Sequence, residues 1–448
     1  MSVIVAKFGG SSLSDAEQFL KVRSILLSDS NRRYVIPSAP GKRFDSDVKV
    51  TDLLYRCHVL ANEGESFDEP FQLVEDRFRG IAGELSLSID LTSLLAEIKA
   101  RIVSESAPDF AASRGEFLNG LLLADLMGWD FIDPAECVRF HDDGSLDAEH
   151  TQLVCAHALM EHERAVIPGF YGGKPDGTIH TFSRGGSDVT GAIVARATDA
   201  DLYENWTDVS GFLTADPRVV KNPRRIEQVT YKELRELSYM GASVLHEDAI
   251  FPVRKAGIPI NIRNTNEPGH PGTLILPHAY GEPEAGITGI AGRKGFAIVA
   301  IEKAMMNAEL GFGRRVLQAA EECGISFEHM PTGIDTMCVV LSQDALDRSR
   351  ERFIQRVIEL TEPDSIEIHD ELALIATVGR GMVRQPGIAS RLFDALYKAE
   401  VNVRMIDQGS SEMNIIVGVS TSEFERAVRA IYCAFIEPID TECMTKTS

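Results

Sequence analysis

The feature that most constrains the fold is an alternation of short apolar strands with helical segments, in which the strands end at Gly or Ser. Residues 2–8 alternate and are rich in β-branched side chains, which predicts a first strand that ends at Gly9-Gly10. A second strand begins at Val35 and ends at Ser38. Similar spacing predicts helices at 52–62, 71–80, 92–104, 116–127 and after Asp188, and strands at 165–167, 202–206 and 258–263. This order predicts an α/β fold with a mostly parallel sheet sandwiched by helices.

Four polar, Gly-rich segments follow predicted strands, and in parallel sheets ligands bind beyond the carboxyl ends of the strands. The first segment is Lys7-Phe8-Gly9-Gly10. Its glycines allow backbone N–H groups to approach a phosphate, and a lysine there suits a transferring phosphoryl group. A tight strand-to-helix turn with a surface lysine explains the same residues about as well.

The second segment, at 183–188, contains Arg184 beside two glycines, an arrangement that suits bidentate capture of a carboxylate. Its Asp188 is equally suited to cap a helix. The third segment contains Thr207 and Asp208, which suit a ribose or base, and continues to Arg218, which suits a phosphate. Taken alone, this third segment is more simply explained as a polar loop.

The fourth segment, at 113–116, places Glu116 at the start of a predicted helix. A carboxylate at that position is a candidate ligand for an ammonium group. It is also favourable for the helix dipole without any ligand.

The chain of 448 residues is longer than one hydrophobic core usually serves, so two or three domains are expected. A net charge of −22 argues against nucleic acid and anionic membranes as partners. No apolar run is long enough to span a bilayer, and the first residues lack the features of a signal peptide, which predicts the cytoplasm. The sequence contains neither G-x-x-x-x-G-K-[ST] nor G-x-G-x-x-G, so a P-loop or dinucleotide-binding fold is not supported.

A Gly- and Pro-rich stretch at 277–292 marks a domain boundary, and the chain beyond it contains an internal repeat. A shift of about 76 residues, counted on the sequence, aligns Gly311 with Gly387 and Val316 with Leu392. Each copy has the pattern turn, helix, strand, turn, strand. We therefore predict a duplicated α+β unit of the βαββαβ type.

Taken together and in this order, the segments resemble those of aspartokinases, which belong to the amino-acid kinase family. The resemblance extends from Lys7 to about Ile275 and continues through the repeat. Its most specific parts are the motifs F-S-R-G-G-S-D, W-T-D-V-S-G and T-A-D-P-R, together with the stretches at 241–246 and 260–264. It implies an amino-acid kinase catalytic domain at 1–285. It also implies a regulatory region at 286–448 with two ACT domains, at about 296–375 and 376–448 or interleaved.

The resemblance implies transfer of the γ-phosphoryl group of MgATP to the β-carboxylate of L-aspartate. The product is 4-phospho-L-aspartate, made in the first step of lysine, threonine and methionine biosynthesis. ATP and Mg²⁺ are the implied cofactors, and no metal ligand is assigned. The implied catalytic residues are Lys7 and Asp188. The implied aspartate-binding residues are Ser38, Thr51, Glu116 and Arg184. The implied ATP-binding positions are Lys7, Gly9, Gly10, Thr207, Asp208, Leu213, Arg218 and Ser243.

Two of these positions depart from the family pattern. Many members have tyrosine where this chain has Leu213, and lysine where it has Ser243. Adenine stacking and one phosphate contact are therefore in question. Lys221 and Arg224 are nearby cations that are able to substitute.

ACT domains bind amino acids at their interfaces, so the resemblance implies feedback inhibition by lysine, with threonine as a further candidate. The implied effector positions lie in the first copy, and their acidic members suit the ammonium of lysine. They are Met306, Glu309, Ser326 and Glu328. Pairing of ACT domains between chains implies a homodimer or a tetramer.

Two alternatives are also compatible with the sequence. One is a kinase of the same fold acting on another amino acid, such as glutamate. The other is a non-catalytic amino-acid sensor with an intact repeat and a degenerate kinase domain. Because no homoserine dehydrogenase domain follows the repeat in this sequence, we expect a monofunctional enzyme.

Overall fold

The computed structural model describes residues 2–183, 185–242, 247–278 and 286–436, and only the backbone of 247–250. The chain forms two compact units. Unit 1 comprises Met1–Phe212, Glu227–Tyr231 and Val244–Ala279, and unit 2 comprises Leu213–Ile226, Lys232–Ser243 and Tyr280–Ser448. Two predicted site positions, Arg184 and Ser243, lie outside the described residues.

Unit 1 is built on an eight-stranded sheet in the order β3-β4-β2-β1-β7-β9-β10-β8. Neighbouring strands run parallel except for β9 and β10. The predicted mostly parallel α/β sheet is therefore confirmed. The strands are β1 (Ile4–Phe8), β2 (Arg32–Pro37), β3 (Asp130–Phe131), β4 (Ala165–Val166), β7 (Leu202–Thr207), β8 (Gln228–Thr230), β9 (Ile260–Asn264) and β10 (Thr273–Leu276), with a separate hairpin of β5 (Tyr171–Gly173) and β6 (Ile179–Thr181).

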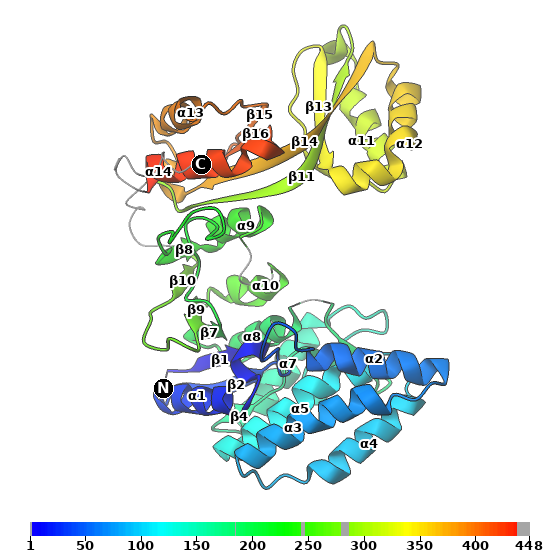
Figure 1. The fold of residues 1–448 in the computed structure, drawn as a ribbon, viewed down its shortest axis with the longest axis vertical. Helices are drawn as coiled ribbons and strands as arrows, with labels where there is room; N and C mark the ends of the chain where they lie inside the picture. The colour runs from blue at the N-terminus through cyan, green and yellow to red at the C-terminus, as the bar shows by residue number, and fades with distance from the viewer. Residues whose placement is uncertain (1, 184, 243–246, 279–285, 437–448) are drawn as a thin grey trace. The chain divides into compact units, whose positions relative to one another are not determined.

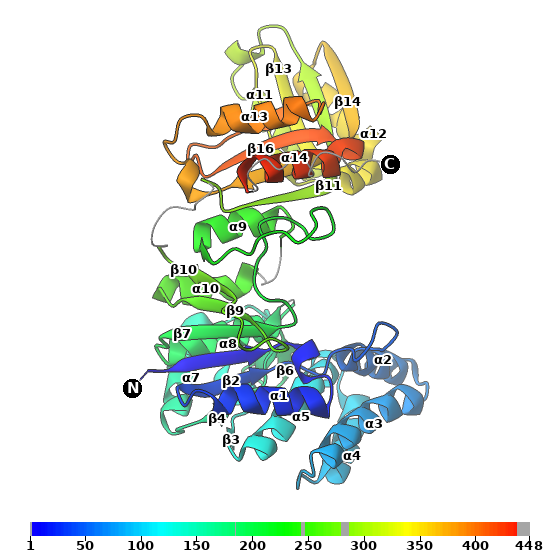
Figure 2. The ribbon, with the colours of Figure 1, turned by 60° about the vertical axis from the view of Figure 1, so that its left-hand side comes forward.

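Helices cover both faces of this sheet, with α8 on one side of β1 and α1 on the other (Figures 1 and 2). α7 and α10 pack on α8, whereas α5 contacts β2 and β4. The helices of unit 1 are η1 (Gly10–Leu13), α1 (Ala16–Leu27), α2 (Val50–Glu63), α3 (Asp68–Glu84), α4 (Leu91–Ser104), α5 (Asp109–Met127), α6 (Pro134–Cys137), α7 (Ala148–Met160), α8 (Gly186–Ala197) and α10 (Glu247–Ala256).

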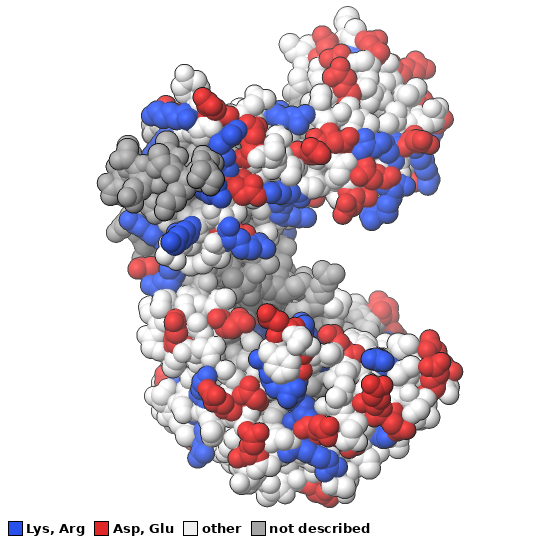
Figure 3. All heavy atoms as spheres, viewed as in Figure 1, with Lys and Arg blue, Asp and Glu red and all other residues white. Residues whose placement is uncertain are grey.

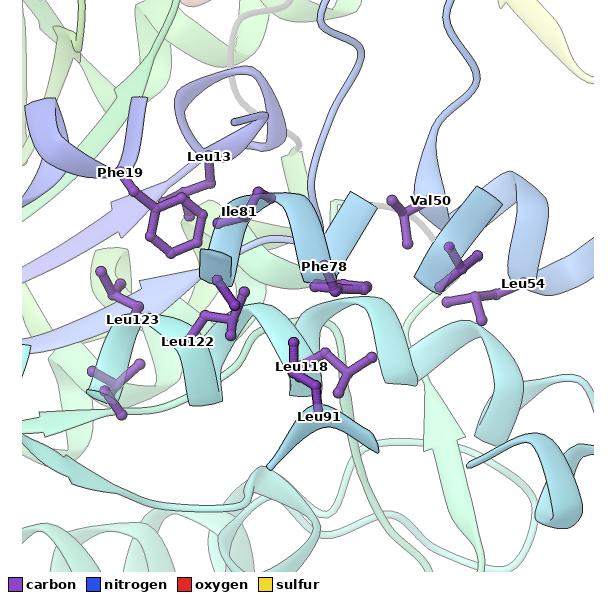
Figure 4. Close-up of a cluster of buried hydrophobic side chains, with 14 of the residues drawn as sticks. Leu13, Phe19, Val50, Leu54, Phe78, Ile81, Leu91, Leu118, Leu122 and Leu123 are labelled. Carbon is purple, nitrogen blue, oxygen red and sulfur yellow. The ribbon is translucent and has the colours of Figure 1, made fainter. Parts of the chain in front are cut away.

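A hydrophobic cluster joins η1 and α1 to the helices α2 to α5 (Figure 4). Phe19 and Phe78 are among its fully buried side chains. α5 passes through this cluster and is buried nearly all around. It begins at Asp109, about two turns before the predicted start near Glu116, because its first turns lack the one-sided apolar pattern from which a surface helix is recognised. Glu116 is therefore an interior helix residue, and the helix dipole does not explain its presence.

Unit 2 contains a six-stranded antiparallel sheet in the order β12-β13-β11-β14-β16-β15. The two long central strands, β11 and β14, are shared by both copies of the repeat. The first half of β11 and the second half of β14 pair beside β16, and their other halves pair beside β13. The elements are β11 (Gly289–Glu302), η2 (Met306–Ala308), α11 (Phe312–Glu322), β12 (Phe327–His329), β13 (Thr336–Ser342), α12 (Gln343–Thr361), β14 (Ser365–Val378), η3 (Arg380–Met382), α13 (Ile388–Lys398), β15 (Met405–Asp407), β16 (Asn414–Ser420), η4 (Thr421–Glu423) and α14 (Phe424–Phe435).

The repeat has one register change that the sequence alignment missed. α11 and α13 begin at Phe312 and Ile388, 76 residues apart, and each follows a glycine in the left-handed region, with φ of 78° at Gly311 and 93° at Gly387. β13 and β16 begin at Thr336 and Asn414, 78 residues apart. Because side chains in a strand alternate with a period of two, a slip of two residues keeps apolar positions on the same face. The shift of 76 therefore still matched apolar residues in the strands.

Two segments that precede residue 285 belong to unit 2. In the first, 213–226, Ala215 and Val220 lie in the core of the second copy. The amide of Arg224 also donates a hydrogen bond of 3.0 Å to the Tyr432 hydroxyl of α14. The second segment contains most of α9 (Tyr231–Tyr239), whose fully buried Glu233 pairs with Arg380 at 3.3 Å.

Candidate active site

The Gly9-Gly10 turn lies where β1 ends, between β7 and the chain that follows β2. The Gly9 amide donates to the carbonyl of Trp206 at 2.9 Å, and the Gly41 amide donates to the carbonyl of Gly10 at 2.8 Å. A Cβ on Gly10 would lie 2.9 Å from the Ala39 carbonyl oxygen, and one on Gly41 would lie 2.6 Å from the Gly10 carbonyl carbon. Glycine is therefore required at both positions by close backbone contact, and neither has a positive φ.

Lys7 lies beside this turn and forms an ion pair with Asp188. A further hydrogen bond to Asp188 connects a third element to the pair. The lysine lies on β1, is 8% exposed, and its Nζ is 2.6 Å from Asp188 Oδ1 in the first turn of α8. The same carboxylate oxygen accepts a hydrogen bond of 2.8 Å from Asn205 Nδ2 on β7. A Cβ on Gly9 would lie 3.7 Å from Lys7 Nζ, so the ammonium lies against the glycine turn. This arrangement presents a fixed positive charge beside backbone that a phosphate can approach closely.

A second polar group gathers at the end of β2, where α5 crosses it. Asn119 Nδ2 donates to the carbonyl of Ser38 at 2.6 Å. Glu116, one helical turn earlier on the same face, is 6% exposed. Among the residues that the structure describes, Glu116 Oε2 and Asn119 Oδ1 are buried without a hydrogen-bond partner. A Cβ on Gly115 would lie 2.8 Å from Ala39 Cβ, so the small residue lets α5 approach this closely.

Burial raises the pKa of Glu116 to about 8, although a hydrogen bond from the Ala39 backbone and the charge of Arg114 lower it. A buried carboxyl with unused acceptor capacity is costly unless a ligand completes it. An ammonium group is a ligand that suits buried acceptor oxygens without partners. The site is therefore suited to the α-ammonium of an amino acid.

The remaining predicted positions lie in both units. Ser38 and Thr51 are partly buried, at the end of β2 and in the first turn of α2. Thr207 ends β7, and its hydroxyl donates to Asp208 at 3.1 Å. Leu213 and Arg218 belong to unit 2, where Arg218 is exposed and pairs with Asp216 at 2.7 Å. The structure thus brings Lys7, Gly9, Gly10, Ser38, Glu116, Asp188 and Thr207 to the carboxyl ends of neighbouring strands and the helices beside them.

Two residues of this site were missed in the sequence. Asn119 is three residues after Glu116, and that spacing is a detectable signal because it places both side chains on one helix face. Asn205 lies beside Lys7 in the register between β1 and β7, which no local pattern reveals.

The predicted effector positions lie in unit 2. Met306 is buried in the core of the first copy, and Ser326 is exposed just before β12. Glu309 pairs with Lys303 at 2.7 Å and also with Arg315. Glu328 accepts a hydrogen bond from the Tyr239 hydroxyl.

The chain is similar to known proteins over nearly all of its length. The amino acid kinase family matches residues 2–264, and an ACT domain matches residues 375–435. Aspartokinase 3 of Bacillus subtilis is 40% identical over 96% of this chain and 98% of its own length. The maize bifunctional aspartokinase/homoserine dehydrogenase 1 is 30% identical over 96% of this chain, which spans 50% of that relative.

Solved structures agree with these matches. Clostridium acetobutylicum aspartate kinase is 52% identical, with a TM-score of 0.90 over 97% of this chain and 100% of that one. Escherichia coli aspartokinase III, in complex with aspartate and ADP, is 25% identical, with a TM-score of 0.74 over the same shares. The chain is thus an ATP-dependent kinase by fold and by similarity. It belongs to the amino acid kinase family and, within that family, to the aspartokinases.

Replacing Lys7 tests the charge beside the glycine turn. We expect Lys7→Ala to lower kcat about 10²- to 10³-fold, the usual effect of removing one preorganised donor, with the circular dichroism spectrum unchanged. Lys21→Ala is the matched control, because Lys21 is a partly exposed lysine of the same unit that pairs with Glu17. Near-normal kcat in Lys7→Ala would remove this lysine from the mechanism.

Replacing Glu116 tests the proposed ammonium contact through pH. We expect kcat/KM for the amino acid to rise with pH as Glu116 loses its proton near pH 8, and this limb to vanish in Glu116→Gln. The same raised pKa means that the native state binds a proton that the unfolded state has released between about pH 4.5 and 8. Wild-type stability should therefore fall there by up to about 1.4 kcal/mol per pH unit relative to Glu116→Gln.

Glu97→Gln, at an exposed position of α4, is the control for both measurements. An unchanged pH profile in Glu116→Gln would contradict the assignment.

Proposed function

We propose that this chain transfers the γ-phosphoryl group of MgATP to the β-carboxylate of L-aspartate, giving 4-phospho-L-aspartate and ADP. The reaction is the first step of lysine, threonine and methionine biosynthesis. The observation that supports the assignment most strongly is the pairing of two opposite features on one sheet edge. Lys7 offers a positive charge beside an open glycine turn, and Glu116 offers a buried carboxylate oxygen with unused acceptor capacity. The E. coli relative crystallised with aspartate and ADP supports both substrates.

The chemistry requires positioning more than proton transfer. The β-carboxylate of aspartate, with a pKa of about 3.9 in water, is already ionised at neutral pH and needs no general base. It forms a bond to the γ-phosphorus while the bond from that phosphorus to the oxygen of ADP breaks. The obstacle is repulsion between two anions. Lys7 and the amides of the glycine turn reduce it, and Asp188 and Asn205 keep the lysine in place.

Glu116 and Asn119 determine which end of the acceptor faces the nucleotide. In this proposal their two oxygens bind the α-ammonium, and Arg184 binds the α-carboxylate. The side-chain carboxylate then points away from α5 toward the Gly9-Gly10 turn. Thr207 and Asp208, at the end of β7, are proposed to bind the nucleotide.

Mg²⁺ enters this proposal as part of the MgATP substrate. Mg²⁺ is often bound by substrate phosphates and only one or two protein carboxylates. The part of the chain that the structure describes has no group of three or more His, Cys, Asp or Glu side chains that could hold a metal ion. When bound, the ion supplies positive charge to the β- and γ-phosphates.

Unit 2 is proposed to bind lysine as a feedback inhibitor. Support comes from the lysine-sensitive aspartokinase 3 of E. coli, 27% identical, and from E. coli aspartokinase III crystallised with lysine and aspartate, 26% identical with a TM-score of 0.74. In the first copy, Glu309 already pairs with Lys303 and Arg315. Glu328 has a neutral donor, Tyr239, so its negative charge is better suited to the ammonium of a ligand. Met306 and Ser326 are proposed to complete this site.

The proposal includes a homodimer or tetramer formed through the ACT domains.

Among the described residues, no helix has the length and hydrophobicity needed to cross a bilayer. On the face shown in Figure 3, acidic and basic side chains are intermixed over both units.

The substrate assignment is tested by initial rates with MgATP and three acceptors offered in turn. We expect a hydroxamate-forming product with aspartate and about 10²-fold lower kcat/KM with glutamate and N-acetylglutamate. N-acetylglutamate lacks the ammonium that Glu116 is proposed to bind, and glutamate places its carboxylate one methylene too far. A preference for glutamate would replace the assigned substrate, and no product with any acceptor would favour a sensor without catalysis.

The effector assignment is tested by adding lysine and threonine, singly and together. We expect lysine alone to inhibit, and Glu328→Gln to raise the lysine concentration for half-inhibition about 10-fold, the effect of one charge-assisted hydrogen bond. Glu321→Gln, at an exposed position of the neighbouring helix α11, should leave it unchanged. Inhibition by threonine alone would identify the other candidate.

A further inference from the structure

A buried arginine, which is not itself a predicted site residue, connects two segments that carry predicted site residues. Arg77 lies on α3, and its side chain is 5% exposed. One terminal nitrogen donates to the carbonyls of Gly41, at 2.9 Å, and Ser14, at 3.3 Å. The other donates to Asp47 Oδ2 at 2.6 Å. The guanidinium thus contacts the end of η1 and two points of the 38–49 loop.

The loop at 38–49 joins two predicted aspartate-binding residues. It begins at Ser38, after β2, and leads to Thr51 in the first turn of α2. Asp47 accepts hydrogen bonds from the Arg43 guanidinium at 2.9 Å and from the Arg43 amide at 3.0 Å. These bonds and Arg77 hold the pKa of the Asp47 carboxyl well below its usual range. The carboxylate is therefore charged at neutral pH and pairs with the Arg77 guanidinium.

The same loop touches the glycine turn directly. Gly41, whose carbonyl binds Arg77, donates its amide to the carbonyl of Gly10. η1, whose last turn leads to the Ser14 carbonyl, begins at Gly10. One guanidinium therefore ties both the phosphate-facing turn and the acceptor-facing loop to α3.

We propose that Arg77 is a positioning residue that sets the distance between the bound nucleotide phosphates and the acceptor carboxylate. The inference rests on the proposed function of Gly9-Gly10 and Ser38. The planar fork of arginine bonds three acceptors in different directions, which the single ammonium of lysine does not reproduce. Loss of the fork lets the two loops shift relative to each other, and a displacement of about 1 Å at reacting groups can cost about 10²-fold in rate.

The test compares Arg77→Lys, Arg77→Ala and Asp47→Asn with Arg79→Ala. Arg79 is on the same helix, is more exposed, and bonds Thr92 instead of the loop. We expect kcat to fall about 10²-fold in Arg77→Ala, by more than any rise in KM for either substrate, and Arg77→Lys to recover little of it. Guanidinium ion, at concentrations far below those that unfold the protein, should restore activity to Arg77→Ala and leave the reduced kcat of Lys7→Ala unchanged.

Each outcome decides the question. If Arg77→Ala keeps the kinetics of Arg79→Ala, or loses activity only in proportion to unfolded protein and without rescue by guanidinium, Arg77 is structural and the inference is wrong. If Arg77→Ala does not fold, Asp47→Asn carries the test, because an unchanged kcat there would also refute the inference. Absence of aspartate phosphorylation in the wild-type chain would instead refute the proposed function.

Discussion

The site depends on one interaction, the ion pair between Lys7 and Asp188. A lysine that is 8% exposed has lost most of its hydration, and only a nearby carboxylate makes that position tolerable. Asp188 is in turn fixed by Asn205, so the lysine is held by β1, β7 and α8 at once. A charge fixed in this way needs little reorganisation when phosphate arrives. The sheet and α8 thus hold the positive charge of Lys7 in a preorganised position.

Glu116 is the opposite case, a buried ionisable group whose hydrogen bonds are incomplete among the described residues. Where Lys7 has a protein partner, the buried carboxyl of Glu116 lacks one for its second oxygen within the described part of the chain, and its pKa is raised by burial to about 8. Such a residue lowers stability as long as no ligand is bound, and a ligand's ammonium removes the penalty. In the proposed function, this destabilisation of the free protein favours an acceptor that carries a positive charge. A pocket lined only by satisfied groups would not discriminate in this way.

Much of the fold and of the candidate site was predictable from the sequence, because the patterns that indicate them are local. The β-branched run at 2–8, the glycines after it and the apolar spacing of the helices predicted the sheet and its carboxyl edge. The start of α5 was misplaced because that helix is buried nearly all around and shows no one-sided pattern. Asn205 and Arg77 act through residues far away in sequence, so only the sheet register and the packing of α3 reveal them. The match between family motifs and site positions came from resemblance, not from physical reasoning alone.

The two copies of the repeat in unit 2 are joined by the strands that they share. β11 and β14 run through both copies, so the strands that pair beside β13 in the first copy are the same strands that pair beside β16 in the second. The core of that second copy contains Ala215 and Val220, from the segment that also carries Leu213 and Arg218. Two positions assigned to ATP therefore lie within the same compact unit as the proposed effector site. The shared strands β11 and β14 connect the first copy, with the proposed effector site, to the second copy, and coupling between two ligands requires in addition that each ligand favours a different arrangement of that connection.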